Sequence, residues 1–390
     1  MKEIGIGLIG AWGWRGKLGA YALEEEGVKL IGAADIYDES LKKFAEFYKE
    51  EKDLFMTNDY KELLAREDID AIFVLSPDYC HEEHAIAALK AGKDVYLEKP
   101  LGITIEECDN ILKVAMEEGR KLFLGHNMRY FPVILKMKEI IDSGIIGDIQ
   151  AVWCRHFVSY GGDAYFKDWH SERKNINGLL LQKGAHDIDV IHWLAGGYSK
   201  AVVGMGKLSV YDKCDKERKA PDEHYEQVTF DTNHWPAEEL KGVSHVVDVE
   251  DHSMVMMQLD NGVQANYMQC HYTPDSGRNY TFIGTKGRLE NIGDSGDCQV
   301  VVYTTRTDGL AVPDITYQLK KIKGTHGGSD PAIVKAFIEY IRDGKKPNTS
   351  PIAARNAVAA GILATESLRE DGGLKVIPSL PQEIIDYFEK

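Results

Sequence analysis

The chain has 390 residues, 44% of them hydrophobic and 28% charged, a composition typical of a globular protein large enough for two domains with sizeable cores. Its net charge of −16 would repel nucleic acid and other polyanions, and we find no local basic patch to offset it. The apolar runs have the length of strands, well short of the roughly 20 residues that span a bilayer. We therefore expect neither a nucleic-acid partner nor a membrane partner.

The cysteines and the N-terminus bear on location and on metal binding. The six cysteines are widely spaced and form no Cys-x-x-Cys pair, which argues against a disulfide framework and against a zinc site. The N-terminus enters the apolar run Ile4–Ile9 directly, without a signal-peptide pattern. The segment His81-Glu82-Glu83-His84 lacks the His-Glu-x-x-His spacing of a zinc-binding helix. We therefore expect a cytoplasmic protein without a bound metal.

The first part of the chain alternates between strand-like and helix-like segments. Strands are expected at the apolar runs Ile4–Ile9, Val28–Ala34, Ala71–Leu75, Val95–Leu97 and Lys121–Gly125. Helices are expected between them at Leu18–Glu25, Glu39–Tyr48, Glu82–Lys90 and Ile105–Glu118. Thr104 with Glu107 predicts a capping box at the start of the last helix. This alternation predicts an α/β domain over residues 1–125, with a doubly wound parallel sheet and helices on both faces.

From about residue 126 the pattern becomes that of an α+β domain. Helices are expected at Pro132–Asp142, Gly184–Leu194, Pro331–Asp343 and Ala353–Glu370. Strands are expected at Ile149–His156, Ser253–Leu259, Val263–Gln269, Tyr280–Ile283 and Gln299–Thr304. The turn Asp260-Asn261-Gly262 predicts a hairpin between two of these strands. We expect residues 126–390 to form a second domain on a large, mostly antiparallel open sheet, with no structural prediction for the polar residues 212–247.

A glycine-rich turn, Gly10-Ala11-Trp12-Gly13-Trp14-Arg15-Gly16, follows the first predicted strand. Glycines in such a turn let backbone amides approach a pyrophosphate at a helix N-terminus. Trp12 stands where Gly-x-Gly-x-x-Gly has its second glycine, and a turn without any ligand explains the segment about equally well. Asp35 favours a dinucleotide, because it closes the second strand 19 residues past Gly16, where a carboxylate can accept hydrogen bonds from an adenosine ribose. Because a carboxylate would repel a 2′-phosphate, NAD is expected rather than NADP.

Two motifs contain the residue types that hydride transfer on a hydroxyl group requires. Lys99, in Glu98-Lys99-Pro100, follows a predicted strand, and open α/β sheets bind ligands at the carboxyl ends of their strands. His186, in Gly184-Ala185-His186-Asp187-Ile188-Asp189, lies on a predicted helix and could accept the hydroxyl proton. Lys99 could stabilise the alkoxide that develops. Taken by itself, His186 is explained better as a histidine packed between two domains.

Together these motifs resemble those of the Gfo/Idh/MocA oxidoreductase family. The resemblance depends on the glycine-rich turn, Ser76-Pro77 with His81, Glu98-Lys99-Pro100, Asn127-Met128-Arg129 and Gly184-Ala185-His186-x-x-Asp189, which keep the family's order and spacing over most of the chain. It implies an N-terminal Rossmann domain and a C-terminal domain whose open sheet is often used for oligomerisation. It also implies NAD(P)-dependent oxidation or reduction of sugars, cyclitols and related polyols. We therefore expect a carbohydrate or polyol substrate and a homodimer or homotetramer.

The resemblance also implies a set of site residues, with Lys99 and His186 as the catalytic pair. Cofactor contacts are expected from Gly10, Trp12, Gly13, Trp14, Asp35, Ser76, Pro77, His81, Glu98, Lys99 and Asn127. Substrate contacts are expected from Lys99, Arg129, Trp169, Gln182, Lys183, His186 and Asp189, although an interdomain salt bridge explains Arg129 equally well and packing explains Trp169. Many polyol-oxidising members have an aspartate where this chain has Gln182. Lys183 is therefore expected to bind substrate or to lower the pKa of His186.

Two other functions are compatible with these motifs. A redox-assisted glycosidase of the same family would oxidise its substrate transiently with bound NAD and eliminate the glycosidic substituent, giving net hydrolysis without net NADH. A non-enzymatic NAD-binding regulator would need no general base, so the presence of both Lys99 and His186 argues against it. The leading hypothesis is an NAD-dependent oxidoreductase that transfers a hydride between a secondary hydroxyl of a sugar, cyclitol or glycoside and the nicotinamide.

Overall fold

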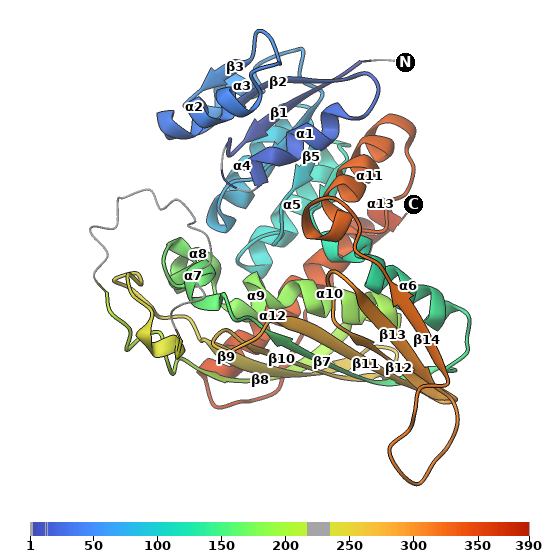
Figure 1. The fold of residues 1–390 in the computed structure, drawn as a ribbon. Coiled ribbons are helices and arrows are strands. Elements are labelled where there is room, and N and C mark those ends of the chain that lie inside the picture. The colour runs from blue at the N-terminus through green and yellow to red at the C-terminus, as the bar shows by residue number, and fades with distance from the viewer. Residues whose placement is uncertain (1–2, 12, 14, 217–234, 390) are drawn as a thin grey trace. The chain divides into compact units, whose positions relative to one another are not determined.

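The computed structural model describes residues 3–11, 13, 15–216 and 235–389, which form two compact units (Figure 1). The first unit comprises Met1–Tyr130, Gly328–Arg355 and Ser379–Lys390, and the second comprises Phe131–Gly327 and Asn356–Pro378. The chain therefore returns to the first unit twice after it has entered the second. Each unit is built on its own β-sheet.

The first unit contains a six-stranded parallel sheet. Its strands are β1 (Ile4–Ile9), β2 (Val28–Ala34), β3 (Phe55–Thr57), β4 (Ala71–Val74), β5 (Asp94–Leu97) and β6 (Leu122–Leu124). They lie in the order β3-β2-β1-β4-β5-β6, and each neighbouring pair is parallel. This is the strand order of a doubly wound dinucleotide-binding sheet, in which the chain builds the sheet outward on one side of β1 and then, from β4, on the other side. The predicted α/β fold is confirmed.

Helices connect these strands and cover the sheet. They are α1 (Leu18–Leu23), α2 (Asp38–Phe47), α3 (Tyr60–Leu64), α4 (His81–Lys90), α5 (Ile105–Glu117), α11 (Ser329–Asp343) and α13 (Gln382–Glu389). The predicted capping box at α5 is confirmed, because the Thr104 side chain accepts the backbone N–H of Glu107 and the Glu107 carboxylate accepts that of Thr104. Such a cap satisfies two of the amides that a helix start leaves without partners.

One of the two returning segments completes the core of the first unit. Phe337 of α11 is fully buried against an aromatic row from three neighbouring strands, with ring centroids 5.2 Å from Phe73, 5.6 Å from Tyr96 and 5.5 Å from Phe123. Each such aromatic pair adds about 0.5–1.5 kcal/mol beyond the burial of its area. The sheet of the first unit is thus packed against a helix that follows it by about 200 residues in the chain.

The second unit contains a nine-stranded mixed sheet. Its strands are β7 (Ile149–Phe157), β8 (Ser199–Lys207), β9 (His252–Leu259), β10 (Gln264–Cys270), β11 (Gly277–Gly284), β12 (Gly287–Ile292), β13 (Cys298–Tyr303), β14 (Ile315–Leu319) and β15 (Lys375–Val376). Their order is β14-β13-β12-β11-β7-β10-β9-β8-β15, and every pair is antiparallel except β7 with β10. The predicted Asn261-Gly262 hairpin joins β9 and β10, so the mostly antiparallel open sheet is confirmed.

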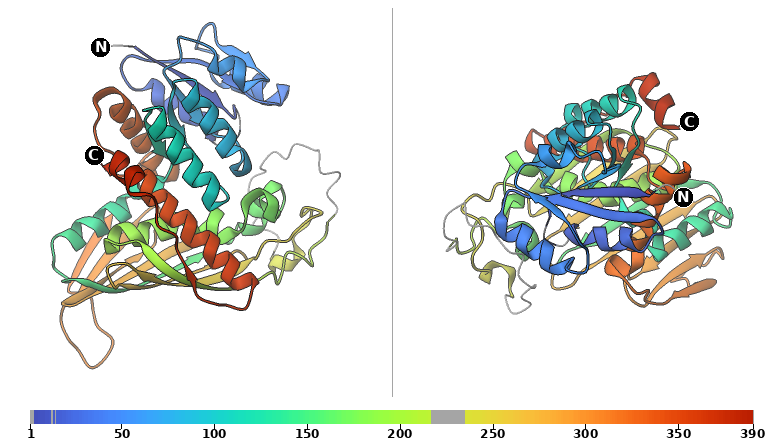
Figure 2. Two further views of the ribbon diagram at one scale, coloured as in Figure 1. Left: turned by 180° about the vertical axis from the view of Figure 1, so that it is seen from behind. Right: turned by 90° about the horizontal axis from the view of Figure 1, so that it is seen from above.

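Helices of the second unit gather on one face of this sheet, as Figures 1 and 2 show. They include α6 (Pro132–Asp142), α7 (Gly161–Tyr165), α8 (Arg173–Ile176), α9 (Leu179–Gln182) and α10 (Gly184–Ala195), and α12 (Pro351–Arg369) crosses from the first unit into the second. α10 packs on β7 and β10, and α6 on β12 and β13. α12 approaches β8 so closely that a Cβ at Gly204 would lie 2.0 Å from the carbonyl oxygen of Ala364.

The opposite face of the sheet carries exposed side chains. Residues of β9 alternate strictly between buried and exposed, as a half-buried strand requires. Several of the exposed residues are large and apolar, and we refer to Trp153, Met205, Met254, Met256 and Ile283 as the outer sheet patch. These side chains come from four strands that are neighbours in the sheet order or separated by one strand. The sheet therefore has one covered and one open apolar surface.

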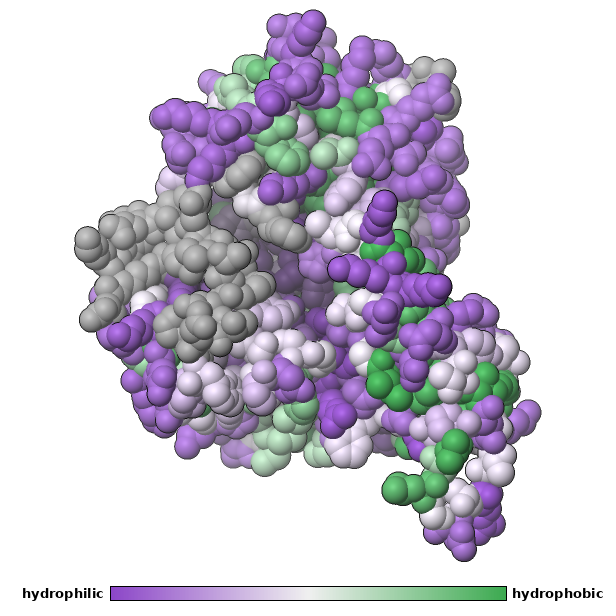
Figure 3. All heavy atoms as spheres, in the orientation of Figure 1, coloured by the Kyte–Doolittle hydropathy of each residue, from purple (hydrophilic) through white to green (hydrophobic). Residues whose placement is uncertain are grey.

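The remaining segments add little regular structure. Residues 212–247, for which no structure was predicted, include 217–234, which lie outside the described residues, and contain the short helix Ala237–Glu239 among the rest. The face drawn in Figure 3 is mainly hydrophilic, in keeping with the net charge of −16. Among the described residues, no helix combines the length and the apolar character needed to cross a membrane.

Candidate active site

The glycine-rich turn and Asp35 form one part of the candidate site, in the first unit. Gly10 has φ of +92°, and a Cβ there would lie 2.8 Å from the backbone of Leu75, so the turn requires glycine. Asp35 directly follows β2. One of its carboxylate oxygens accepts the backbone N–H of Ala11 at 2.9 Å and the other that of Tyr37 at 3.0 Å. Each oxygen has a second lone pair, so the fixed carboxylate can still accept hydrogen bonds from a ribose.

Three other residues of this turn, Trp12, Gly13 and Trp14, were also expected to contact the cofactor. Gly13 has φ of +89°, with nothing within 4 Å of the position of a Cβ, so it lies in open space beside the turn. Trp12 and Trp14 lie outside the described residues. The contacts that these three residues were expected to make with a cofactor stay predictions.

His81 joins two loops at the carboxyl edge of the first sheet. It is fully buried, with Nδ1 2.6 Å from the carbonyl oxygen of Pro100 and Nε2 2.9 Å from that of Ser76. A neutral imidazole can donate only one of these two hydrogen bonds. Its neighbour His84 lies 2.8 Å from the Ser76 hydroxyl, and burial lowers the pKa of His84 to about 4. In this arrangement His81 holds the segments Ser76-Pro77 and Glu98-Lys99-Pro100 together, and a direct cofactor contact by His81 stays a prediction.

Glu98 links the Lys99 motif to the glycine-rich turn. The buried Glu98 carboxylate is ion-paired with Arg15 and lies 3.2 Å from both the Tyr96 hydroxyl and the backbone N–H of Lys99. Arg15 also pairs with Asp330 at 3.2 Å, and Asn127 donates to the same Asp330 oxygen at 3.0 Å. These contacts hold the backbone of Lys99 directly after β5, at the sheet edge where doubly wound folds bind their ligands.

Arg129 is anchored inside the first unit. It is buried and donates from Nη1 to the carbonyl oxygen of Asn348 at 2.6 Å. Asn348 belongs to the segment Gly328–Arg355, which returns to this unit. The sequence left open whether Arg129 contacts substrate or a salt-bridge partner, and its contact with substrate stays a prediction.

The His186 segment belongs to the second unit, where α10 begins at Gly184 as the sequence predicts. A separate short helix, α9, ends at Gln182, so that Lys183 lies between the two helices. The ring of Tyr267 packs beside this junction, where a Cβ at Gly184 would approach it to 3.0 Å. Gln182 and His186 therefore lie on different helices, and His186 occupies the first turn of α10.

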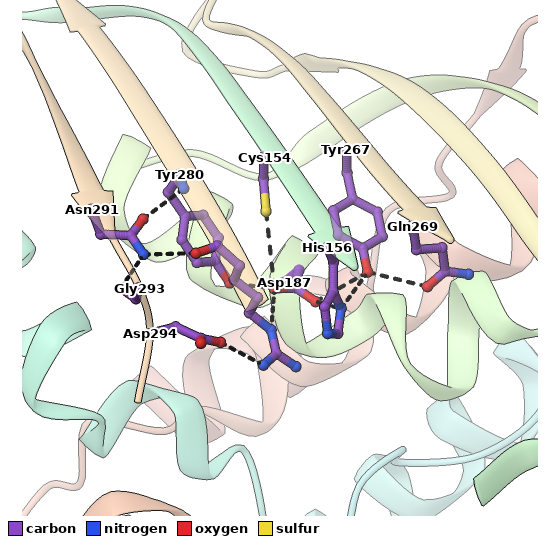
Figure 4. Close-up of polar contacts among 10 residues, drawn as sticks. Cys154, His156, Asp187, Tyr267, Gln269, Tyr280, Asn291, Gly293 and Asp294 are labelled. Atoms are coloured by element: carbon purple, nitrogen blue, oxygen red, sulfur yellow. Dashed lines mark hydrogen bonds and ion pairs between the residues drawn. The ribbon is translucent and has the colours of Figure 1, made fainter. Parts of the chain in front are cut away.

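Asp187 is the centre of a buried polar network that fastens α10 to the sheet (Figure 4). Its carboxylate is 2.8 Å from Nε of Arg278 and 3.1 Å from Nδ1 of His156, and it accepts hydrogen bonds from the hydroxyls of Tyr267 and Tyr280. Although burial favours the neutral acid, the charge of Arg278 holds the pKa of Asp187 well below its usual range. Asp187 is therefore charged at neutral pH, and its contacts fasten the first turn of α10 to the sheet.

In the rest of this network, the Arg278 cation has carboxylate partners and His156 is neutral. Arg278 forms a second ion pair with Asp294, at 3.1 Å. Burial and the charge of Arg278 lower the pKa of His156 to about 4, so this imidazole is neutral at pH 7 and donates its Nδ1–H to Asp187. Asp189, which was expected to contact substrate, is also buried on α10, and that contact stays a prediction.

Lys183 and Trp169 complete the residues expected to bind substrate. The Lys183 ammonium lies 5.6 Å from the centre of the Tyr165 ring and 5.9 Å from that of Tyr160. Trp169 is half-buried and stacks on His170 with ring centroids 3.6 Å apart. The contacts of both residues with a sugar stay predictions, as do those of Gln182 and His186.

Sequence reasoning missed several residues of this site. Asp187, Arg278, His156, Tyr160 and Tyr165 come from three separate stretches of the chain, and only Asp187 lies within a motif that the sequence analysis singled out. A weak signal existed in the two acids Asp187 and Asp189, two residues apart on a mostly apolar helix, because buried carboxylates require partners.

Several known proteins are similar to this chain in sequence or in fold. The 2,7-anhydro-N-acetylneuraminate hydratase of Mediterraneibacter gnavus is 24% identical over 96% of this chain and 97% of its own. An inositol 2-dehydrogenase/D-chiro-inositol 3-dehydrogenase of Halalkalibacterium halodurans is 34% identical over 43% of this chain and 45% of its own. A levoglucosan dehydrogenase solved with NADH and levoglucosan shares the fold, with a TM-score of 0.77 at 18% identity over 97% of this chain and 100% of that one.

Two family models match successive parts of the chain. Residues 4–126 match the NAD-binding Rossmann fold of an oxidoreductase family, and residues 138–376 match the C-terminal alpha/beta domain of the same family. The two matches together cover most of the chain. It therefore belongs to the Gfo/Idh/MocA family of oxidoreductases and has an NAD-binding Rossmann domain.

Proposed function

We propose that this oxidoreductase is an NAD-dependent dehydrogenase that transfers a hydride between a secondary hydroxyl of a sugar, cyclitol or glycoside and C4 of the nicotinamide. The observation that carries the proposal is that two suitable side chains follow strands of the first sheet at its carboxyl edge. There Asp35 is fixed by two backbone amides after β2, and Lys99 follows β5. The first residue fits the ribose of NAD, and the second is a cation suited to a developing alkoxide.

The chemistry assigns different tasks to the two proposed catalytic residues. Removing a hydride from a carbon that bears a hydroxyl group leaves a carbonyl, and the hydroxyl proton must go to a base. We assign that proton to the imidazole of His186, which Asp187 and its network hold in place through α10. We assign stabilisation of the alkoxide to the Lys99 ammonium. Bound NAD would accept the hydride.

The remaining expected residues take supporting roles in this proposal. Gly10, Ser76, Pro77 and Asn127 border the proposed cofactor site from the turn after β1, the loop after β4 and the segment after β6. Arg129, Trp169, Gln182 and Asp189 are proposed to bind or orient the substrate. The relatives named as inositol and levoglucosan dehydrogenases favour a polyol or sugar substrate. None of the three relatives named above is described as a glycosidase.

The test of this function is a panel of monosaccharides, cyclitols and glycosides incubated with NAD and, separately, with NADP. Formation of NADH that depends on a sugar or cyclitol supports the proposal. Release of an aglycone without net NADH would instead identify the redox-assisted glycosidase. Binding of NAD without turnover of any member of the panel would favour the non-enzymatic regulator.

We also propose that the chain self-associates, as a homodimer or homotetramer, through the outer sheet patch. An exposed apolar surface of this kind usually marks an interaction site, and a symmetric contact between two copies would bury it on both. The cytoplasmic location expected from the sequence stays a prediction.

A further inference from the structure

Lys183 is a charged residue of the second unit that is only partly exposed to solvent. It lies at the junction of α9 and α10, is half-buried, and directs its ammonium over the rings of Tyr160 and Tyr165. Burial opposes the charge, but attraction by these two tyrosines raises the pKa of Lys183 to about 12. At pH 7 this part of the molecule therefore contains a full positive charge.

No described carboxylate neutralises that charge. Within residues 3–11, 13, 15–216 and 235–389, no aspartate or glutamate lies at ion-pair distance from the Lys183 ammonium. Other cations of the same unit differ in this respect. Arg278 pairs with both Asp187 and Asp294, and Lys167, which is also half-buried, pairs with Asp163 at 2.7 Å. A sheltered cation without a counterion is costly, so a further anion would stabilise it.

The neighbouring side chains supply no such anion in their ordinary forms. Burial lowers the pKa of His156 to about 4 and that of His271 well below its usual value, so both imidazoles are neutral at pH 7. Tyr160 and Tyr165 interact with the ammonium through side-chain hydrogen bonds and through their rings, but neutral phenols compensate its charge less than a carboxylate would. Attraction by Lys183 also lowers the pKa of Tyr160, so a Tyr160 phenolate is the alternative partner that an experiment must exclude.

Lys183 is also close to the proposed general base along the chain. It directly precedes α10, and His186 follows three residues later in the first turn. Side chains three residues apart in a helical conformation are neighbours, with Cβ atoms about 5–6 Å apart. A carboxylate near Lys183 would also meet the positive end of the α10 dipole. A sugar acid carries a carboxylate and secondary hydroxyls at separations of this size.

We propose that Lys183 binds the carboxylate of the substrate, so that the substrates of this enzyme are sugar acids rather than neutral sugars. This inference rests on the proposed dehydrogenase function and specifies its substrate class. Lys183 is a binding residue in this account, and His186 and Lys99 carry out the chemistry as proposed above. The carboxylate is bound in both the ground state and the transition state, so its contact acts on KM more than on kcat.

The experiment uses matched pairs that differ in one carboxylate, D-glucose with D-glucuronate and D-galactose with D-galacturonate. NADH formation is measured for each sugar, and binding of each to the enzyme–NADH complex is measured by calorimetry. The full-length protein is compared with Lys183→Met, with Lys183→Arg, and with Lys174→Met. The last variant removes an exposed lysine charge of the same unit and serves as the matched control.

We expect the acid to be preferred over its neutral partner in at least one pair. Lys183→Met should lower the ratio of kcat/KM for acid over neutral sugar by about 10- to 100-fold, mainly through KM, as expected for loss of a charged hydrogen bond. Lys183→Arg should restore part of that ratio, and Lys174→Met should leave it unchanged. NADH binding and the thermal unfolding temperature report whether each variant is folded.

Three results would overturn the proposal. One is turnover of neutral sugars with neither binding nor turnover of the acids, which would leave the dehydrogenase function standing. Another is that neither acid binds and that none of the four sugars is oxidised, which would count against both the dehydrogenase function and the sugar-acid substrate. The third is an equal loss of kcat on acids and neutral sugars in Lys183→Met with KM unchanged, which would assign Lys183 to proton transfer with Tyr160.

Discussion

The substitution Asp187→Asn tests the network that fastens α10 to the sheet. It keeps the size of the side chain but removes the charge that faces Arg278, and it disturbs the hydrogen bonds from His156, Tyr267 and Tyr280. Losing one partner of a buried ion pair costs about 3–5 kcal/mol. We expect about 3 kcal/mol, the low end of that range, because Asp294 still neutralises Arg278.

That cost corresponds to a measurable fall in thermal stability. For a unit of this size, about 3 kcal/mol lowers Tm by about 6–12 °C. Thermal unfolding followed by circular dichroism or calorimetry at pH 7 measures the shift. The matched control is Asp142→Asn, which breaks the exposed pair with Lys138 on α6, worth about 0–1 kcal/mol. A shift for Asp187→Asn no larger than that of Asp142→Asn would refute the role given to the network.

The same network predicts how stability depends on pH. The folded pKa of Asp187 is lowered below its unfolded value of about 3.9, so its contribution is fully present above that value. The contribution is lost as the pH falls from about 4 toward the folded pKa. The difference in unfolding free energy between the unmodified protein and Asp187→Asn should therefore be constant from pH 5 to 7 and shrink below about pH 4. A difference that grew on acidification would contradict this assignment.

Three further predictions concern the cofactor, the assembly and one helix. Asp35→Ser should narrow the preference for NAD over NADP in binding titrations, and equal affinity in the unmodified protein would contradict the role of Asp35. Light scattering at micromolar concentration should find an oligomer that Trp153→Glu or Met256→Glu dissociates, whereas a monomeric unmodified protein would refute assembly through the outer sheet patch. Thr104→Ala should lower stability by about 1 kcal/mol in denaturant unfolding, with Thr104→Ser nearly neutral; equal losses would argue against the cap.

The elements predicted well from sequence are those whose signals are local. The β1 and β2 strands, the Thr104 capping box and the hairpin at Asn261-Gly262 each depend on a few adjacent residues, and all are found as expected. Short elements such as β3 (Phe55–Thr57) carry too few residues for a period to be recognised.

The parts that could not be predicted depend on contacts between distant segments. Nothing in the local pattern of α11 indicates that it returns to the first unit, because its apolar face would suit any sheet. The close approach of Tyr267 to Gly184, at the junction of α9 and α10, joins residues more than 80 positions apart. The role of Asp187 could not be predicted, because only the fold brings Arg278 and His156 to its carboxylate.

The central claim is that Lys99 and His186 carry out hydride transfer to NAD, and it is tested most directly by kcat for NADH formation in Lys99→Ala and His186→Ala. The substrate is the best one found in the panel, and the Kd for NAD is measured alongside. Loss of a general base typically lowers the rate about 100- to 10,000-fold. We predict a loss of that size in kcat for each variant, with the Kd for NAD nearly unchanged. If His186→Ala kept most of its activity, the assigned base would be wrong.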